Sequence, residues 1–278
     1  MTLRQIVPTS VTLAAMLSGF LSILVTVEGM RVDAPAHPYY RWAALLIMLA
    51  MVLDGLDGNL ARWLKGTSEF GAELDTYVDM TAFGIAPAIL IFAVTLHSEP
   101  IWRVVLPSAV ALSGVVRLAR FKVRDPLRGQ GGYAGLPITV NAGWVAMFIY
   151  ISQTKPIETF SLNHGPVAAL FLVGVFCFVV LQVTNLRYPK PTKNPALYAL
   201  CVALVVVLIA LAFSKGLQRW STVVALIMIA LGVSYIVFGP LFVKGIAAHR
   251  ARMEARNANG EETADSEDKN GEAAGDKS

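Results

Sequence analysis

The sequence predicts an all-α, polytopic membrane protein: a helical bundle with about eight transmembrane helices. Three observations predict this class. The chain has 278 residues, of which 55% are hydrophobic and only 15% are charged, whereas soluble proteins carry about 25% charged residues. Its apolar residues fall into eight long runs, and turn-forming residues separate most of them. Because lipid cannot satisfy backbone polar groups, runs of this kind must be helices.

The expected helices cover roughly 7–27, 42–62, 70–96, 101–119, 136–153, 164–185, 195–214 and 220–243. The first run follows Arg4 as a signal peptide would. Seven more runs follow it and no small-residue cleavage site is clear, so we expect a transmembrane helix there. Residues 251–278 hold eight acidic residues, four basic residues and no aromatic residue. Such a segment cannot bury enough surface to fold, which predicts a disordered, charged tail.

Lys and Arg residues are divided unevenly between the two sides of the predicted bundle. With the N-terminus inside, 15 of them fall on the inner side and six on the outer side. Basic residues favour the cytoplasmic side of a membrane. We therefore expect both termini, and the loops after the second and fourth helices, to lie at the cytoplasmic face of the cell membrane.

Four aspartates lie where a membrane makes charge costly. Asp54 and Asp57 are near the cytoplasmic end of the second helix, and Asp75 and Asp79 are near the same end of the third. Their spacing puts each pair on one helix face, and the short loop 65–68 makes the two helices antiparallel neighbours. The four carboxylates then converge in one cleft, where a cation must neutralise them. Oxygen ligands with no His or Cys nearby indicate Mg²⁺ or Mn²⁺ rather than zinc.

Small residues and one arginine accompany the acids. Gly58, Ala61 and Gly71 would let a bulky ligand approach the helix backbone, and Arg62 is a natural partner for phosphate. Glycine and alanine also serve helix packing, and a single aspartate at a helix end can face interfacial water. Four acids on two facing stripes with an adjoining Arg favour a metal site that takes a phosphorylated substrate.

This segment resembles the signature of the CDP-alcohol phosphotransferase (CDP-alcohol phosphatidyltransferase) family at eight fixed positions: Asp54-x2-Asp57-Gly58-x2-Ala61-Arg62-x8-Gly71-x3-Asp75-x3-Asp79. The flanking stretches SEFGAELD, FGIAPA, VRLARF and GLP are similar to the phosphatidylserine synthase branch. The resemblance implies a family core of six helices, which we place in residues 1–190. Two additional transmembrane helices would then occupy 191–250, and the tail 251–278.

The resemblance also implies a reaction and the residues that carry it. The L-serine hydroxyl would attack the lipid-side phosphate of CDP-diacylglycerol, releasing CMP and forming phosphatidylserine. Asp54, Asp57 and Asp75 would bind the metal, and Asp79 would act as general base and touch a second metal. The CDP moiety would be held by Gly58, Ala61, Arg62 and Gly71. The implied partners are the two substrates, the bilayer and a second copy of the chain in a homodimer, with no nucleic acid.

Several alternatives stay open at this point. Arg117 and Arg120 either clamp an acceptor carboxylate or a lipid phosphate or anchor their helix at the membrane surface. The chain departs from the family at Pro8-Thr9, where relatives carry Pro-Asn, so one nucleotide contact is left undecided. It also departs at 138–141, after GLP, so the recognition of the acceptor is left undecided. Glycerol 3-phosphate or inositol phosphate could replace serine as the acceptor. A cation transporter is a third hypothesis, although no polar ladder crosses the membrane.

Overall fold

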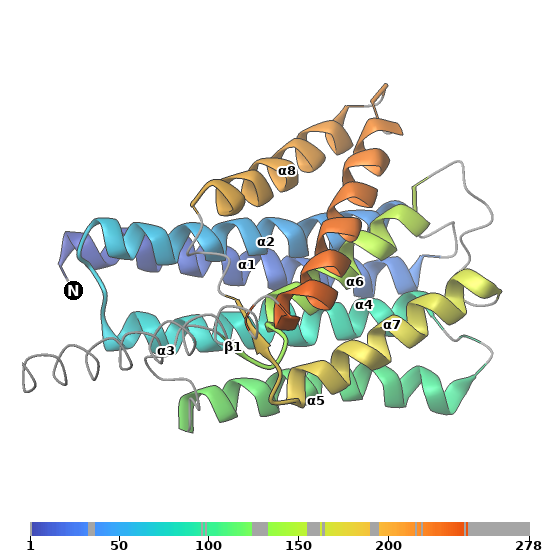
Figure 1. Ribbon diagram of the computed structural model, residues 1–278. Coiled ribbons are helices and arrows are strands. Elements are labelled where there is room, and N and C mark those ends of the chain that lie inside the picture. The colour runs from blue at the N-terminus through green and yellow to red at the C-terminus, as the bar shows by residue number, and fades with distance from the viewer. Residues whose placement is uncertain are drawn as a thin grey trace, which may run out of the picture.

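The computed structural model describes residues 2–32, 37–95, 97, 99–123, 133–154, 162, 165–189, 195–214, 216–217, 219–241 and 243. In order along the chain, they form α1 (Leu3–Arg31), α2 (His37–Trp63), α3 (Glu69–Val78), the π-helix η1 (Asp79–Ile85), α4 (Ala86–Val94), α5 (Pro100–Val123), α6 (Ile138–Ser152), α7 (Pro166–Val183), α8 (Pro195–Phe213) and the helix Arg219–Leu241. The two-residue strands β1 (Tyr133–Ala134) and β2 (Arg187–Tyr188) pair antiparallel. In Figure 1, α1, α2 and the segment from α3 through η1 to α4 run alongside one another, whereas α8 and the helix Arg219–Leu241 lie at an angle to them. The predicted all-α helical bundle is confirmed.

The eight predicted apolar runs all appear as helical segments within the described residues. Six segments are long and apolar enough to cross a membrane: Leu3–Arg31, Pro38–Trp63, Glu69–Val94, Pro100–Val123, Pro166–Val183 and Arg219–Leu241. The apolar helices Ile138–Ser152 and Ala199–Phe213 are shorter. The predicted tail, 251–278, lies outside the described residues.

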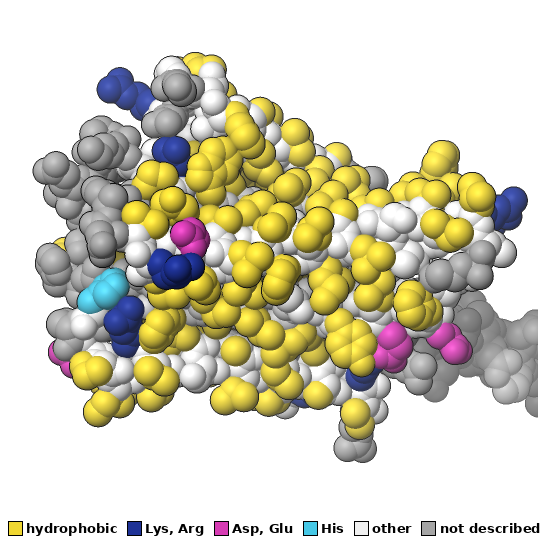
Figure 2. All heavy atoms as spheres, turned by 180° about the vertical axis from the view of Figure 1, so that it is seen from behind, with side chains coloured by type: hydrophobic (Ala, Val, Ile, Leu, Met, Phe, Trp, Pro, Cys, Tyr) yellow, Lys and Arg dark blue, Asp and Glu magenta, His cyan; other side chains and the backbone are white. Residues whose placement is uncertain are grey.

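The surface of the bundle is apolar between its two ends. In Figure 2, hydrophobic side chains cover the middle of the visible face, and charged side chains gather toward the ends. Large side chains such as Leu112, Phe176 and Trp220 are each more than 60% exposed. An apolar surface of this extent is not tolerated in water but suits a lipid environment. The chain is therefore an integral membrane protein.

A seam of small polar residues joins α1 to α2. The Ser18 hydroxyl donates a hydrogen bond to the carbonyl oxygen of Leu46 (2.8 Å), and the Ser22 hydroxyl donates one to that of Ala43 (2.9 Å). Small side chains let membrane helices approach closely, and hydroxyl groups can then bond across the contact. The seam fixes the register of α1 against α2, which carries two of the four aspartates.

The third predicted helix, 70–96, is interrupted by the π-helix η1. Within it, the Ala86 N–H donates to the carbonyl of Thr81, five residues earlier rather than four. Asp79 is the first residue of η1. A π-helical turn of this kind is rare and often occurs at functional sites. The stretch that the sequence predicts as one continuous helix is therefore α3, η1 and α4, joined end to end.

The turn between α2 and α3 is held against the start of α1. Lys65 adopts a positive φ of 52°, and a Cβ on Gly66 would collide with the backbone carbonyl of Arg4. The Ser68 hydroxyl then caps α3 by accepting a hydrogen bond from the Gly71 N–H (3.0 Å). These contacts bring the last turns of α2 and the first turns of α3 to one end of the bundle, as the short loop predicts.

The last two helices pack onto the rest of the bundle. Trp42 of α2 contacts Phe213 of α8 edge to face, with ring centroids 4.8 Å apart. In the helix Arg219–Leu241, the Ser221 hydroxyl lies 2.7 Å from the Tyr150 hydroxyl of α6. Both contacts lie away from the end of the bundle that carries the aspartates, which is consistent with a packing role.

Candidate active site

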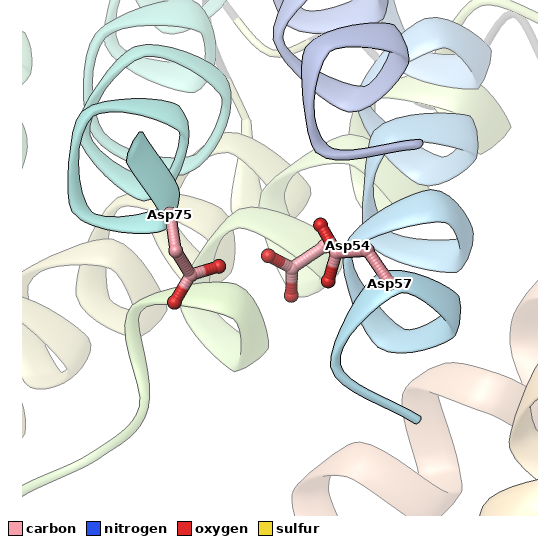
Figure 3. A group of neighbouring side chains, drawn as sticks. All are labelled: Asp54, Asp57 and Asp75. Carbon is pink, nitrogen blue, oxygen red and sulfur yellow. The ribbon is translucent and has the colours of Figure 1, made fainter. Parts of the chain in front are cut away.

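Three carboxylates from two helices meet at one end of the bundle. Asp54 and Asp57 extend from α2 and Asp75 extends from α3 toward them, as Figure 3 shows. One carboxylate oxygen from each residue lies within 4.8 Å of the others. Asp57 is buried, Asp54 is half-buried and Asp75 is exposed. The group is thus shielded from solvent at Asp57 and open to solvent at Asp75.

The chemistry of these three residues fits a divalent cation. The Oδ2 atom of Asp57 is buried and has no hydrogen-bond partner within the described part of the chain. The carboxyl groups of Asp54 and Asp75 lie within hydrogen-bonding reach of each other. Ionised carboxylates only accept hydrogen bonds, so two of them come this close only around a shared proton or a cation. Hard oxygen ligands suit Mg²⁺ and Mn²⁺.

Asp79 stands beside this group without belonging to it. It is half-buried at the junction of α3 and η1, where its N–H donates to the carbonyls of Asp75 and Thr76. Its carboxylate lies within electrostatic range of Asp57 and Asp75 and of the Arg117 guanidinium of α5. The structure therefore brings all four predicted aspartates into one neighbourhood and separates Asp79 from the closest three.

Gly58 faces open space. A Cβ placed on it would meet no atom within 4 Å, whereas one on Gly19, Gly114 or Gly174 would meet a neighbouring helix at under 3 Å. Helix packing thus explains those three glycines but does not explain Gly58. Gly58 follows Asp57 at the open side of the carboxylate group, so its bare backbone leaves room for a ligand to approach there.

The other residues predicted to hold the CDP moiety lie around the same opening. Ala61 is half-buried one turn beyond Gly58, and Gly71 is half-buried in the first turn of α3. The Arg62 guanidinium is exposed and donates a hydrogen bond to the Asn59 side-chain oxygen (2.7 Å). Asn59 thereby orients the Arg62 guanidinium beside the opening, and phosphate binding by Arg62 stays a prediction.

Arg117 and Arg120 have different surroundings, although the sequence groups them. The Arg117 guanidinium lies within electrostatic range of the Asp79 carboxylate. The Arg120 guanidinium donates to the carbonyl of Val183 (2.8 Å) and to the side chain of Asn185, so it caps the C-terminal end of α7. A substrate contact for Arg120 stays a prediction, and its observed bonds give it a structural function.

Two neighbours of the site are not revealed by the sequence pattern. Lys122 of α5 forms an exposed ion pair with Glu73 of α3, which ties α5 to the helix of Asp75. The Thr12 hydroxyl of α1 lies within hydrogen-bonding reach of the Asp57 carboxylate. Both contacts join residues far apart in the sequence, and local spacing gives no signal for such pairs.

Residues 5–180 match the CDP-alcohol phosphatidyltransferase family. A CDP-diacylglycerol–serine O-phosphatidyltransferase of Mycobacterium tuberculosis is 35% identical over 228 residues, which cover 80% of this chain and 75% of that protein. The enzyme of the same name from Helicobacter pylori is 29% identical over 187 residues, covering 67% and 76%. An archaetidylserine synthase of Methanothermobacter thermautotrophicus is 31% identical over 177 residues, covering 62% and 65%.

Proposed function

This chain belongs to the CDP-alcohol phosphatidyltransferase family, and we propose that it transfers the phosphatidyl group of CDP-diacylglycerol to L-serine. The products are phosphatidylserine and CMP. The proposal combines the serine-specific names of several relatives that are 27–35% identical with the carboxylate group of the site. An enzyme of this kind is a phosphotransferase of phospholipid biosynthesis.

The observation that carries the proposal is the meeting of Asp54, Asp57 and Asp75 within 4.8 Å beside the open backbone of Gly58. Three carboxylate ligands can bind a divalent cation, and the open space beside Gly58 leaves room for the diphosphate of the nucleotide. A divalent cation bound there would neutralise the diphosphate and stabilise the departing CMP. We propose Mg²⁺ or Mn²⁺ in this position.

The remaining residues supply orientation and proton transfer. Gly58, Ala61 and Gly71 let the CDP moiety lie against the backbones of α2 and α3, and Arg62 pairs with its phosphates. Asp79 accepts the proton of the serine hydroxyl as that oxygen attacks the lipid-side phosphorus. Arg117, beside Asp79, is suited to the serine carboxylate. The proton thus moves from the acceptor to Asp79, and the bond from phosphorus to the CMP oxygen breaks.

The distribution of basic residues and the family resemblance support a setting for the reaction. The excess of Lys and Arg in the loops at the aspartate end favours a site at the cytoplasmic face of the cell membrane. Residues 1–190 would form the catalytic core, 191–250 an added pair of transmembrane helices, and 251–278 a charged tail. The family resemblance favours a homodimer.

The test is a reaction with purified protein in mixed micelles of detergent and CDP-diacylglycerol, with Mn²⁺ or Mg²⁺. L-Serine, glycerol 3-phosphate and inositol phosphate are offered separately, and both CMP and the lipid product are measured. We expect CMP release that depends on serine and stops with EDTA. Asp57→Asn should be inactive, while Glu28→Gln, which alters an exposed acid paired with Arg31, should retain activity. Release with another acceptor alone would refute the serine assignment.

A further inference from the structure

The hydroxyl groups on the buried side of α1 follow a regular path along α2. Ser22 bonds to the carbonyl of Ala43, and Ser18 bonds to that of Leu46. The two helices run antiparallel, so the same register continued toward the aspartate end puts Thr12 beside residues 52 and 53 of α2. A helical side chain points back toward the N-terminus of its own helix. The Asp57 carboxylate therefore reaches back to the level of Thr12.

Thr12 and Asp57 are both shielded from solvent. Thr12 and Asp57 are each only 5% exposed. The Thr12 hydroxyl donates a hydrogen bond to the carbonyl oxygen of Pro8 (3.0 Å) and also lies within reach of the Asp57 carboxylate, its alternative acceptor. A hydroxyl has one proton to donate, and an ionised carboxylate is a stronger acceptor than a backbone carbonyl.

The two oxygens of the Asp57 carboxylate are thus in different situations. Asp57 is the most buried of the four aspartates, and its Oδ2 atom has no hydrogen-bond partner among the described residues. The Thr12 hydroxyl and the Gly58 N–H are the donors within reach of this carboxylate, and donors of this kind restrict its rotation. Ligand orientation by such a hydrogen bond commonly changes metal affinity by 10–100-fold.

We propose that Thr12 is a positioning residue, whose hydroxyl holds the Asp57 carboxylate so that Oδ2 is presented to the cation. This inference rests on the metal-binding role proposed above for Asp57. It assigns the first helix a part in the geometry of a site whose three proposed metal ligands come from α2 and α3.

The chain offers a matched set of variants for the test. Thr12→Val removes the hydroxyl and keeps the shape, and Thr12→Ser restores the hydroxyl. Thr26→Val is the control, because Thr26 is fully buried on the same side of α1 and its hydroxyl donates to the Ser22 carbonyl (2.7 Å), far along the helix from the aspartates. Mn²⁺ binding is measured by electron paramagnetic resonance on full-length protein in nanodiscs, without any substrate.

We expect Thr12→Val to weaken Mn²⁺ binding about tenfold, with Thr12→Ser and Thr26→Val within about twofold of the wild type. In the serine reaction, Thr12→Val should need more Mn²⁺ for half-maximal rate and recover most of kcat at saturating Mn²⁺. Unchanged Mn²⁺ affinity in Thr12→Val, or an equal loss in Thr26→Val, would overturn the proposal. So would a wild-type protein with no saturable Mn²⁺ binding.

The substrate-free measurement separates this inference from the proposed reaction. If the Thr12 series behaves as expected but no CMP is released with serine, the serine assignment fails and the positioning role stands. If serine-dependent CMP release is found and the Thr12 variants bind Mn²⁺ equally, the enzyme assignment stands and the positioning role fails.

Discussion

Gly19 of α1 and Ala82 of η1 touch without room for a side chain between them. A Cβ on Gly19 would lie 2.5 Å from the Cβ of Ala82 and 2.6 Å from its Cα. Ala82 belongs to the π-helix that begins with Asp79. The contact therefore sets the position of the proposed general base relative to α1 and, through the α1–α2 seam, relative to the carboxylates of α2.

Gly19→Ala should lower both stability and activity. The added methyl group must push η1 away from α1, and overpacking of this kind costs about 1–3 kcal/mol. We expect a lower midpoint of thermal unfolding in detergent and a fall in kcat, because Asp79 moves with η1. Gly232→Ala is the control, since a Cβ there meets no atom within 4 Å. A Gly19→Ala protein with wild-type kcat would show that η1 does not position the base.

Gly58→Ala should separate binding from folding. The new methyl group enters open space, and alanine is a better helix former than glycine, so the midpoint of unfolding should be unchanged or higher. The same methyl group would occupy the surface on which the CDP moiety is proposed to lie. We expect KM for CDP-diacylglycerol to rise about tenfold, equivalent to about 1.4 kcal/mol of binding. Unchanged KM would remove Gly58 from the nucleotide site.

The sequence predicts the features that depend on local spacing. Asp54 and Asp57 are three residues apart and Asp75 and Asp79 are four apart, so each pair shares a helix face whatever the rest of the bundle does. Because the turn at 65–68 is short, the C-terminal end of α2 and the N-terminal end of α3 must lie at the same end of the bundle. The apolar runs likewise specify helices because the lipid excludes unpaired backbone groups.

The features that sequence reasoning does not reach depend on contacts between distant segments. The change to a π-helix at Asp79 has no signal in the sequence. Each backbone hydrogen bond of η1 spans five residues instead of four, and this shift does not require a particular residue type. The partners of Arg120, at 183–185, lie more than 60 residues away along the chain. Thr12 approaches Asp57 only because the α1–α2 seam fixes their register. No helix period encodes such pairings.

Asp79→Asn should reduce turnover strongly and leave metal binding in place. Asp79 lies outside the three-carboxylate group, and the loss of a general base reduces rates by about 10²–10⁴-fold. We expect kcat to fall by this amount while Mn²⁺ affinity and CDP-diacylglycerol binding stay near wild type. Asp75→Asn is the comparison, because it removes a proposed ligand and should weaken Mn²⁺ binding. If Asp79→Asn weakens Mn²⁺ binding equally, Asp79 is chiefly a metal ligand.

Arg117→Ala and Arg120→Ala should fail in different ways, because the two guanidinium groups have different neighbours. Arg117 faces Asp79, so its loss should raise KM for L-serine with little change in KM for CDP-diacylglycerol. Arg120 donates to the last carbonyls of α7, so its loss should lower the midpoint of unfolding by a few degrees, in keeping with about 1 kcal/mol for hydrogen bonds left unmade. Initial rates at varied serine and thermal unfolding, measured on both variants, distinguish these outcomes. A raised KM for serine in Arg120→Ala, at wild-type stability, would instead make Arg120 a substrate ligand and require the end of α7 to open when serine binds.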